Sequence, residues 1–315
     1  MAYLPFYLTP EEFEDLQSKQ EQKIREGSNL CTWSCSNIEE AFRWNAVKHT
    51  CFALIPGVLL FLFIAHVAHH WIGSVSAVLV FGAIAYATYL QMGVDNLYEY
   101  ALSEFGLIQK KCRYEPKWLN TTMQAIAGLC AFASLFSIAV VGSMAFASTG
   151  IFLLMGWGMM NRKPMNESKT VIAHSSDFLF AHYNKKRRVV HFFHKYDACF
   201  YQDVAKTTVR RSQTRGGSYL FFKSEQELEE VIQRFTDEWN LDCYEIDDVN
   251  KLFDLDSGKP AELIKTPSRS QSYLKEEIHK KKESGEAELR WRYLYKGQWL
   301  TDKEIEQFDN AEAEG

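Results

Sequence analysis

The run CFALIPGVLLFLFIAHVA at residues 51–68 contains no Asp, Glu, Lys or Arg. Similar runs follow at residues 73–90, 123–141 and 144–160. Each approaches the ~20 residues that an α-helix needs to cross the hydrocarbon of a bilayer, where a helix satisfies its own backbone hydrogen bonds. The pattern predicts four transmembrane helices in two hairpins. The last two runs are separated only by Gly142 and Ser143, so a long helix followed by a short re-entrant one is the alternative for the second hairpin.

Basic residues outside these runs predict their orientation, because Lys and Arg are retained on the cytoplasmic side. The connection between the hairpins contains Lys110, Lys111, Arg113 and Lys117, whereas the short links at 69–72 and 142–143 contain none. We therefore expect an integral, multi-pass membrane protein with both termini in the cytoplasm, in the inner membrane if the source is bacterial. No charge interrupts the runs, which argues against an ion path.

Outside the apolar runs the chain is polar, so that 47% hydrophobic residues, 24% charged residues and a net charge of −5 describe only an average. Its seven cysteines contain no CxxC pair, and neither a disulfide nor a zinc site is expected. The expected divisions are a helical arm (1–48), a first hairpin (49–92), a loop (93–119), a second hairpin (120–163), a β-rich domain (164–245), a flexible linker (246–288) and an aromatic hairpin with a terminal helix (289–315).

Short sequence patterns predict the helices and strands within these divisions. Capping boxes beginning at Thr9 and Ser36 predict two helices in the arm, and alternation around Gly106 predicts two strands in the loop. Four β-branched or aromatic runs between 170 and 222 predict a β-meander. A third capping box at Ser224 then opens an amphipathic helix. The fold class expected is thus an α-helical membrane protein with an α+β domain, a β-meander plus a C-terminal helix.

The segment FYQDVAKTTV at residues 200–209 resembles a strand entry of the pleckstrin-homology-like superfold found in bacterial membrane-anchored proteins. The resemblance covers residues 169–239, where short strands are closed by one helix, and extends to residues 98–109. It implies an interaction module without naming a ligand, because this superfold hosts many functions.

Nine basic residues against two acidic ones lie between 185 and 215. Such clusters attract anionic lipid headgroups when they lie near a bilayer. Nucleic acid is the less favoured ligand, since no recognition motif accompanies the charge. A solvated turn is the plain alternative. The candidate lipid-binding residues are Lys185, Lys186, Arg187, Arg188, Arg210 and Arg211.

Aromatic residues near the C-terminus form a second candidate site. Trp291, Tyr293 and Tyr295 share one face of an alternating strand, and Trp299 follows a turn at Lys296 and Gly297. A hairpin this small needs a partner, so these four residues are expected to bind another protein or a second copy of the chain.

Other chemistry is weakly signalled. His66 and His70 share a helical face at a spacing that can hold a metal, but no third ligand is near them, and no metal site is expected. Odd spacing sends His191 and His194 to opposite faces of a strand. No phosphate loop, HExxH, GxSxG or dinucleotide fingerprint occurs, so no cofactor or catalytic residue is expected.

The favoured function is a non-enzymatic membrane scaffold or assembly subunit that displays a basic interaction module. The alternatives are an oligomeric channel or transporter formed by the four helices, and a membrane-bound enzyme of unknown chemistry.

Overall fold

The computed structural model of the chain describes residues 3–42, 95–113, 168–253 and 260–313, with scattered positions between 44 and 59, between 118 and 128, and at 157 and 161. The pattern of contacts divides the chain into two compact units. The first comprises residues 1–41, 98–111 and 169–315, and the second comprises residues 42–97 and 112–168. The packing described below is that of the first unit.

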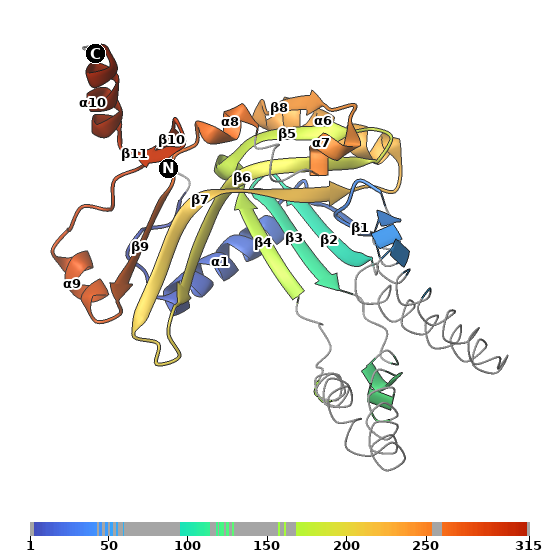
Figure 1. The fold of residues 1–315 in the computed structure, drawn as a ribbon, viewed down its shortest axis with the longest axis horizontal. Helices are drawn as coiled ribbons and strands as arrows, with labels where there is room; N and C mark the ends of the chain where they lie inside the picture. Colours follow the sequence, from blue (N-terminus) through green and yellow to red (C-terminus); the bar gives the residue numbers. More distant parts are fainter. Residues whose placement is uncertain are drawn as a thin grey trace. The chain divides into compact units, whose positions relative to one another are not determined.

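A four-stranded sheet with the order β1-β2-β3-β4 is assembled from three separate parts of the sequence (Figure 1). Its strands are β1 (Cys31–Asn37), β2 (Asn96–Ser103), β3 (Gly106–Arg113) and β4 (Ser168–His174). The two strands expected around Gly106 are confirmed as β2 and β3. Gly106 has a φ of +151°, and a Cβ atom there would lie 2.2 Å from the carbonyl oxygen of Ala173. Glycine therefore allows β4 to approach the turn closely.

A five-stranded sheet has the order β8-β5-β6-β7-β9. Its strands are β5 (Phe178–Asn184), β6 (Val189–Tyr201), β7 (Thr208–Phe221), β8 (Asp242–Glu245) and β9 (Arg269–Leu274). β8 pairs with β5 in parallel, and the other pairs are antiparallel. The expected meander is confirmed for β5, β6 and β7, whereas the run that begins it forms β4 in the other sheet.

Helix α6 (Glu225–Trp239) packs on the five-stranded sheet. The Oγ of Ser224 accepts the amide of Glu227 at 3.2 Å, which confirms the capping signal. The buried side chains of α6 recur at helical spacing, and the ring of Phe235 lies 5.2 Å from that of Phe192. Buried residues of both sheets and α6 form one apolar cluster, so the two sheets and this helix share a core.

Helix α1 (Pro10–Arg25) begins with a complete capping box. The Glu12 amide donates to the Thr9 hydroxyl at 3.2 Å, and the Thr9 amide donates to the Glu12 carboxylate at 2.9 Å. The first predicted helix of the arm is therefore confirmed.

The segment that precedes α1, residues 3–8, is held by polar groups of the five-stranded sheet. Arg211 is fully buried and donates hydrogen bonds to the carbonyl oxygens of Leu4, Pro5 and Phe6. The same guanidinium forms an ion pair with Asp197. Burying a cation costs desolvation free energy unless the cation is paired and hydrogen-bonded. The carboxylate and the three carbonyl oxygens offset this cost for Arg211.

The C-terminal part adds short elements: α7 (Val249–Phe253), α8 (Ala261–Ile264), α9 (Glu277–Glu283), β10 (Tyr293–Tyr295), β11 (Gln298–Leu300) and α10 (Asp302–Ala313). β10 and β11 form the expected hairpin, with positive φ angles at Lys296 and Gly297. The Thr301 amide donates to the Glu304 carboxylate at 2.7 Å at the start of α10, so the expected hairpin and terminal helix are confirmed.

The expected fold class is corrected by the structure. The described chain is a mixture of helices and several β-sheets, and none of its described helices is long and apolar enough to cross a membrane. The same finding contradicts an integral, multi-pass protein with cytoplasmic termini. The four apolar runs lie, apart from scattered positions, outside the described residues. The expectation followed from hydropathy alone, whereas the described core is formed by strand pairs distant in sequence.

Three local expectations also differ from the structure. The capping box at Ser36 predicts a helix, but residues 31–37 pair as β1. The segment 200–209 contains the end of β6, the turn at residues 202–207 and the start of β7, and the Asp203 carboxylate accepts the amides of Thr207 and Thr208. Residues 246–288, expected as a flexible linker, contain β9, which pairs with β7.

Candidate functional site: a cleft between the sheets and a pocket at the tail

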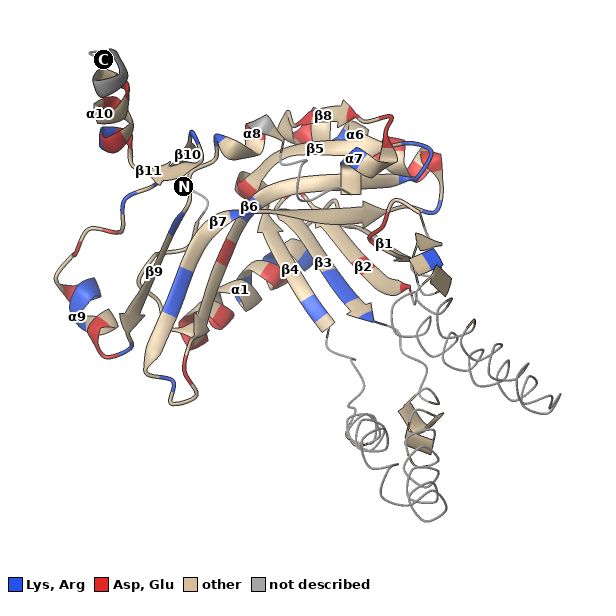
Figure 2. Ribbon diagram, viewed as in Figure 1, with Lys and Arg blue, Asp and Glu red and all other residues tan. Residues whose placement is uncertain are grey.

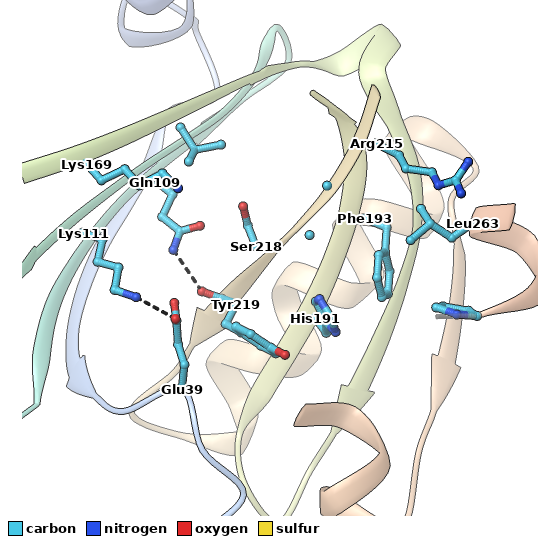
Figure 3. Close-up of a pocket in the computed structure, with 14 residues that line it drawn as sticks. Glu39, Gln109, Lys111, Lys169, His191, Phe193, Arg215, Ser218, Tyr219 and Leu263 are labelled. Carbon is cyan, nitrogen blue, oxygen red and sulfur yellow. Dashed lines mark hydrogen bonds and ion pairs between the residues drawn. The ribbon is translucent and has the colours of Figure 1, made fainter. Parts of the chain in front are cut away.

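A cleft of about 390 Å³ lies between the two sheets of the first unit (Figure 3). β3 and β4 form one wall, β6 and β7 form the other, and α8 closes one end. The lining residues labelled in Figure 3 are Glu39, Gln109, Lys111, Lys169, His191, Phe193, Arg215, Ser218, Tyr219 and Leu263.

His191 is part of the packed wall of this cleft. Its ring lies 4.3 Å from that of Tyr219 and 4.1 Å from that of Phe193. Burial, with a smaller contribution from His182, lowers the pKa of His191 to about 3. The imidazole is therefore neutral at neutral pH. A Cβ atom on Gly217 would lie 2.3 Å from its Nε2, so the ring occupies space that only glycine leaves open.

Polar contacts join the two walls. The Gln109 amide donates to the Tyr219 carbonyl oxygen at 3.4 Å, and the Tyr100 hydroxyl donates to the same oxygen at 2.8 Å. Lys111 forms an ion pair with Glu39 at 2.6 Å. The hydrogen bonds of Tyr100 and Gln109 link β2 and β3 to β7, whereas the Lys111–Glu39 ion pair joins β3 to the segment that follows β1.

The arrangement offers no activated nucleophile among the described residues. His194 is buried, with its Nε2 3.0 Å from the hydroxyl of Ser218. Burial raises the pKa of the Cys199 thiol to about 11, and its Sγ donates to the carbonyl oxygen of Leu8 at 3.5 Å. A thiol with a raised pKa is a poor nucleophile. No group of three metal-ligating side chains occurs within the described chain, and His66 and His70 lie outside it.

The six candidate lipid-binding residues do not form one exposed surface. Arg211 is fully buried, and Arg187 donates to the Asn37 side chain at 2.8 Å. Lys185 pairs with Glu229 at 2.8 Å, and Arg188 donates to the carbonyl oxygen of Lys223. Arg210 donates to the hydroxyl of Ser272 at 3.2 Å, and Lys186 is exposed. Proximity in sequence therefore does not separate basic residues that support the fold from basic residues that face solvent.

Some of the four aromatic residues of the tail pack against other side chains, and Trp299 is exposed to solvent. The Trp291 ring lies 5.1 Å from the Tyr3 ring, with the Arg269 guanidinium 4.1 Å from its centroid. Tyr293 pairs with Leu300 in the hairpin. The Tyr295 hydroxyl donates to Asp309 at 2.6 Å. Trp299 is 43% exposed and lies 5.0 Å from the Arg215 guanidinium.

Beside Trp299 is a second pocket, of about 440 Å³, which we call the arginine pocket. It is lined by Arg210, Ser268, Arg269, Ser270, Gln271, Leu289, Arg292 and Trp299. Figure 2 shows basic segments in β7 and β9, the strands that contribute to it. Sequence reasoning named Arg210 and Trp299 for different ligands and missed Arg292. They come together through the pairing of β7 with β9 and through the backbone bonds of 2.8 and 3.0 Å between Ser268 and Arg292.

Comparison with known families matches residues 12–256 to the model of the TsiV2 immunity protein. The chain belongs to this family. The match covers both sheets except β9, and it ends before the tail. No curated protein and no solved structure matches the chain.

Family membership agrees with the expectation of a protein partner, because an immunity protein acts against a toxin. It does not support a lipid ligand. The pleckstrin-homology-like resemblance is not confirmed, since the matching family is a different one.

Proposed function

We propose that this chain is an immunity protein that protects its producer by binding a toxin and neutralising it. The observation that carries the proposal is the family match over residues 12–256, which covers most of the described sheets. Binding rather than enzymatic inactivation is favoured because the cleft between the sheets contains a neutral, packed histidine and Cys199 has a raised pKa.

Stable surfaces support a binding role. The cleft walls are joined by hydrogen bonds, and the tail hairpin is fixed to β9 through Ser268 and Arg292. Preorganised surfaces lose less conformational entropy on association than flexible ones do.

A mixed-culture experiment tests the proposal. A strain lacking this chain is grown in contact with its parent, which makes the toxin and the chain. We expect the deletion strain to lose survival and to regain it when the full chain is expressed from a plasmid. Equal survival of the deletion strain and the parent, under conditions in which other unprotected cells are killed, would contradict an immunity function.

A further inference from the structure

We propose that the arginine pocket receives an acidic segment of the partner protein, with Arg210 and Arg292 binding its carboxylates and Trp299 packing against it. This inference rests on the proposed function, because the partner is the toxin that the chain neutralises. The docking surface would then lie at the meeting point of β7, β9 and the tail hairpin.

The pocket has a defined structure. β9 pairs with β7, and Ser268 and Arg292 exchange backbone hydrogen bonds that fix the tail beside β9. The Arg269 guanidinium lies 4.1 Å from the ring centroid of Trp291, and the Arg215 guanidinium lies 5.0 Å from that of Trp299. Its residues are therefore positioned before a partner arrives.

Charge identifies the kind of partner. Three of the eight lining residues are arginines, and none is Asp or Glu. Arg269 is neutralised by its ion pair with Glu288. Arg210, in contrast, donates to the neutral hydroxyl of Ser272. Arg292 is exposed, and its charge helps to lower the pKa of the nearby Glu304 carboxylate, which does not line the pocket. The pocket is locally positive in a chain whose net charge is −5, which favours a carboxylate-bearing occupant.

The residue types fit a protein interface. A guanidinium can bind a carboxylate through two parallel hydrogen bonds, which a Lys ammonium cannot do. Trp and Arg are enriched among the residues that dominate binding energies, and Trp299 is a large apolar side chain left 43% exposed. A pocket of about 440 Å³ accommodates a few side chains of a partner loop.

Arg292→Glu is the test variant, and Arg290→Glu is its matched control. Both positions are exposed, lie two residues apart and undergo the same change of charge, but only Arg292 lines the pocket. Arg210→Gln is a second test variant on a different element. Thermal unfolding midpoints of the purified full chains establish that each variant is folded.

The first readout is survival in mixed culture with the parent strain. We expect Arg290→Glu to protect the deletion strain as the wild type does, and Arg292→Glu to lower survival by about tenfold or more. Equal protection by the two folded variants would overturn the docking surface. If the wild-type chain itself gave no protection, the proposed function would fail instead.

The second readout does not depend on the toxin. The indole N–H resonance of Trp299, assigned with Trp299→Phe, is followed by NMR during titration of the full chain with hexaglutamate, hexalysine or inorganic phosphate at matched ionic strength. We expect hexaglutamate alone to shift the resonance, in the wild type and Arg290→Glu, with the shift lost in Arg292→Glu and Arg210→Gln. An equal shift with phosphate would indicate a small-anion site, and no shift with hexaglutamate would remove the carboxylate preference. Either result overturns the proposal.

Discussion

Gly217 lies where β7 passes the imidazole of His191. A side chain at this position would place its Cβ atom 2.3 Å from Nε2, whereas at Gly216 the nearest atom is the Cβ of Tyr196 at 3.4 Å. The ring of His191 is held by Tyr219 and Phe193 and has little room to move. Neighbouring glycines thus have different roles that the sequence GG does not distinguish.

Gly217→Ala is expected to lower the free energy of unfolding by about 1–3 kcal/mol, the usual cost of overpacking. Gly216→Ala is the matched control, and we expect a change within about 0.5 kcal/mol. Denaturant unfolding of both variants measures the difference. Equal stability of the two would mean that His191 can move away from the added methyl group.

Asp177 carries a carboxyl whose Oδ1 is buried without a hydrogen-bond partner among the described residues. Burial raises its pKa to about 7, and the negative charge of Asp197 adds to the shift, while Lys195 opposes it. An unfolded carboxyl has a pKa near ~4. Between pH ~4 and ~7 the folded chain therefore holds a proton that the unfolded chain has released.

It follows that the free energy of unfolding falls as pH rises through this window, and that this fall depends on Asp177. Asp177→Asn is expected to be more stable than the wild type above pH ~7, by roughly 1–4 kcal/mol, and similar to it below pH ~4. Urea unfolding at several pH values measures the difference. Buried histidines titrate in both proteins and cancel in the comparison. A difference that stays constant with pH would rule out a raised pKa at Asp177.

Arg211 shows what sequence cannot reveal at a single residue. It lies among nine basic residues between 185 and 215 and is one of the candidate lipid-binding residues, but its side chain on β7 is buried against Asp197 and the carbonyl oxygens of the N-terminal segment. Two of its carbonyl partners, Pro5 and Phe6, lie about 200 residues away in sequence. A local pattern contains no information about pairs so distant.

At the scale of elements, the N-terminal segment is the clearest case of long-range recognition. The Tyr273 hydroxyl on β9 lies 3.1 and 3.0 Å from the carbonyl oxygens of Phe6 and Leu8, and it accepts the Leu8 amide at 3.2 Å. One hydroxyl thus replaces the partners that a neighbouring strand would supply to this segment.

Tyr273→Phe removes this hydroxyl and leaves the buried Leu8 amide without its acceptor, at an expected cost of about 1–3 kcal/mol. Tyr244→Phe on β8, where the ring is 44% exposed, is the control and should change little. Hydrogen exchange at the Leu8 amide should quicken only in Tyr273→Phe. Unchanged exchange there would show that the segment is held without the hydroxyl.

Elements with local signals could be predicted, and elements defined by distant partners could not. The capping boxes at Thr9 and Ser224 each open a helix, because their hydrogen bonds lie within four residues. The same signal at Ser36 fails, since residues 31–37 pair with β2. β9 was missed because its polar sequence gains order only by pairing with β7.

At the scale of the molecule, the apolar runs lead to the wrong fold class, and the sequence predicts the meander β5-β6-β7 and the pair β2-β3 but not how distant strands join them into sheets. The four-stranded sheet joins residues from 31–37, 96–113 and 168–174, so its register depends on contacts across long stretches of chain. The candidate site also depends on contacts between residues that are distant in sequence. Trp299 was named from its aromatic neighbours, but the pocket around it requires Arg210 of β7 and Arg292 of the tail.

Neutralisation by binding implies a fixed stoichiometry between the chain and the toxin. This property distinguishes binding from enzymatic inactivation of the toxin. A bound partner stays bound, whereas an enzyme inactivates many molecules in turn. The toxin against which the mixed culture shows protection is the reagent for this comparison.

The decisive measurement is a titration of that purified toxin with the purified full chain, followed by residual toxin activity at short and long incubation times. Neutralisation by binding predicts that residual toxin activity falls linearly to an end point near a simple whole-number ratio of chain to toxin, and that it is the same at both incubation times. Continuing loss of activity at substoichiometric amounts of the chain would contradict it.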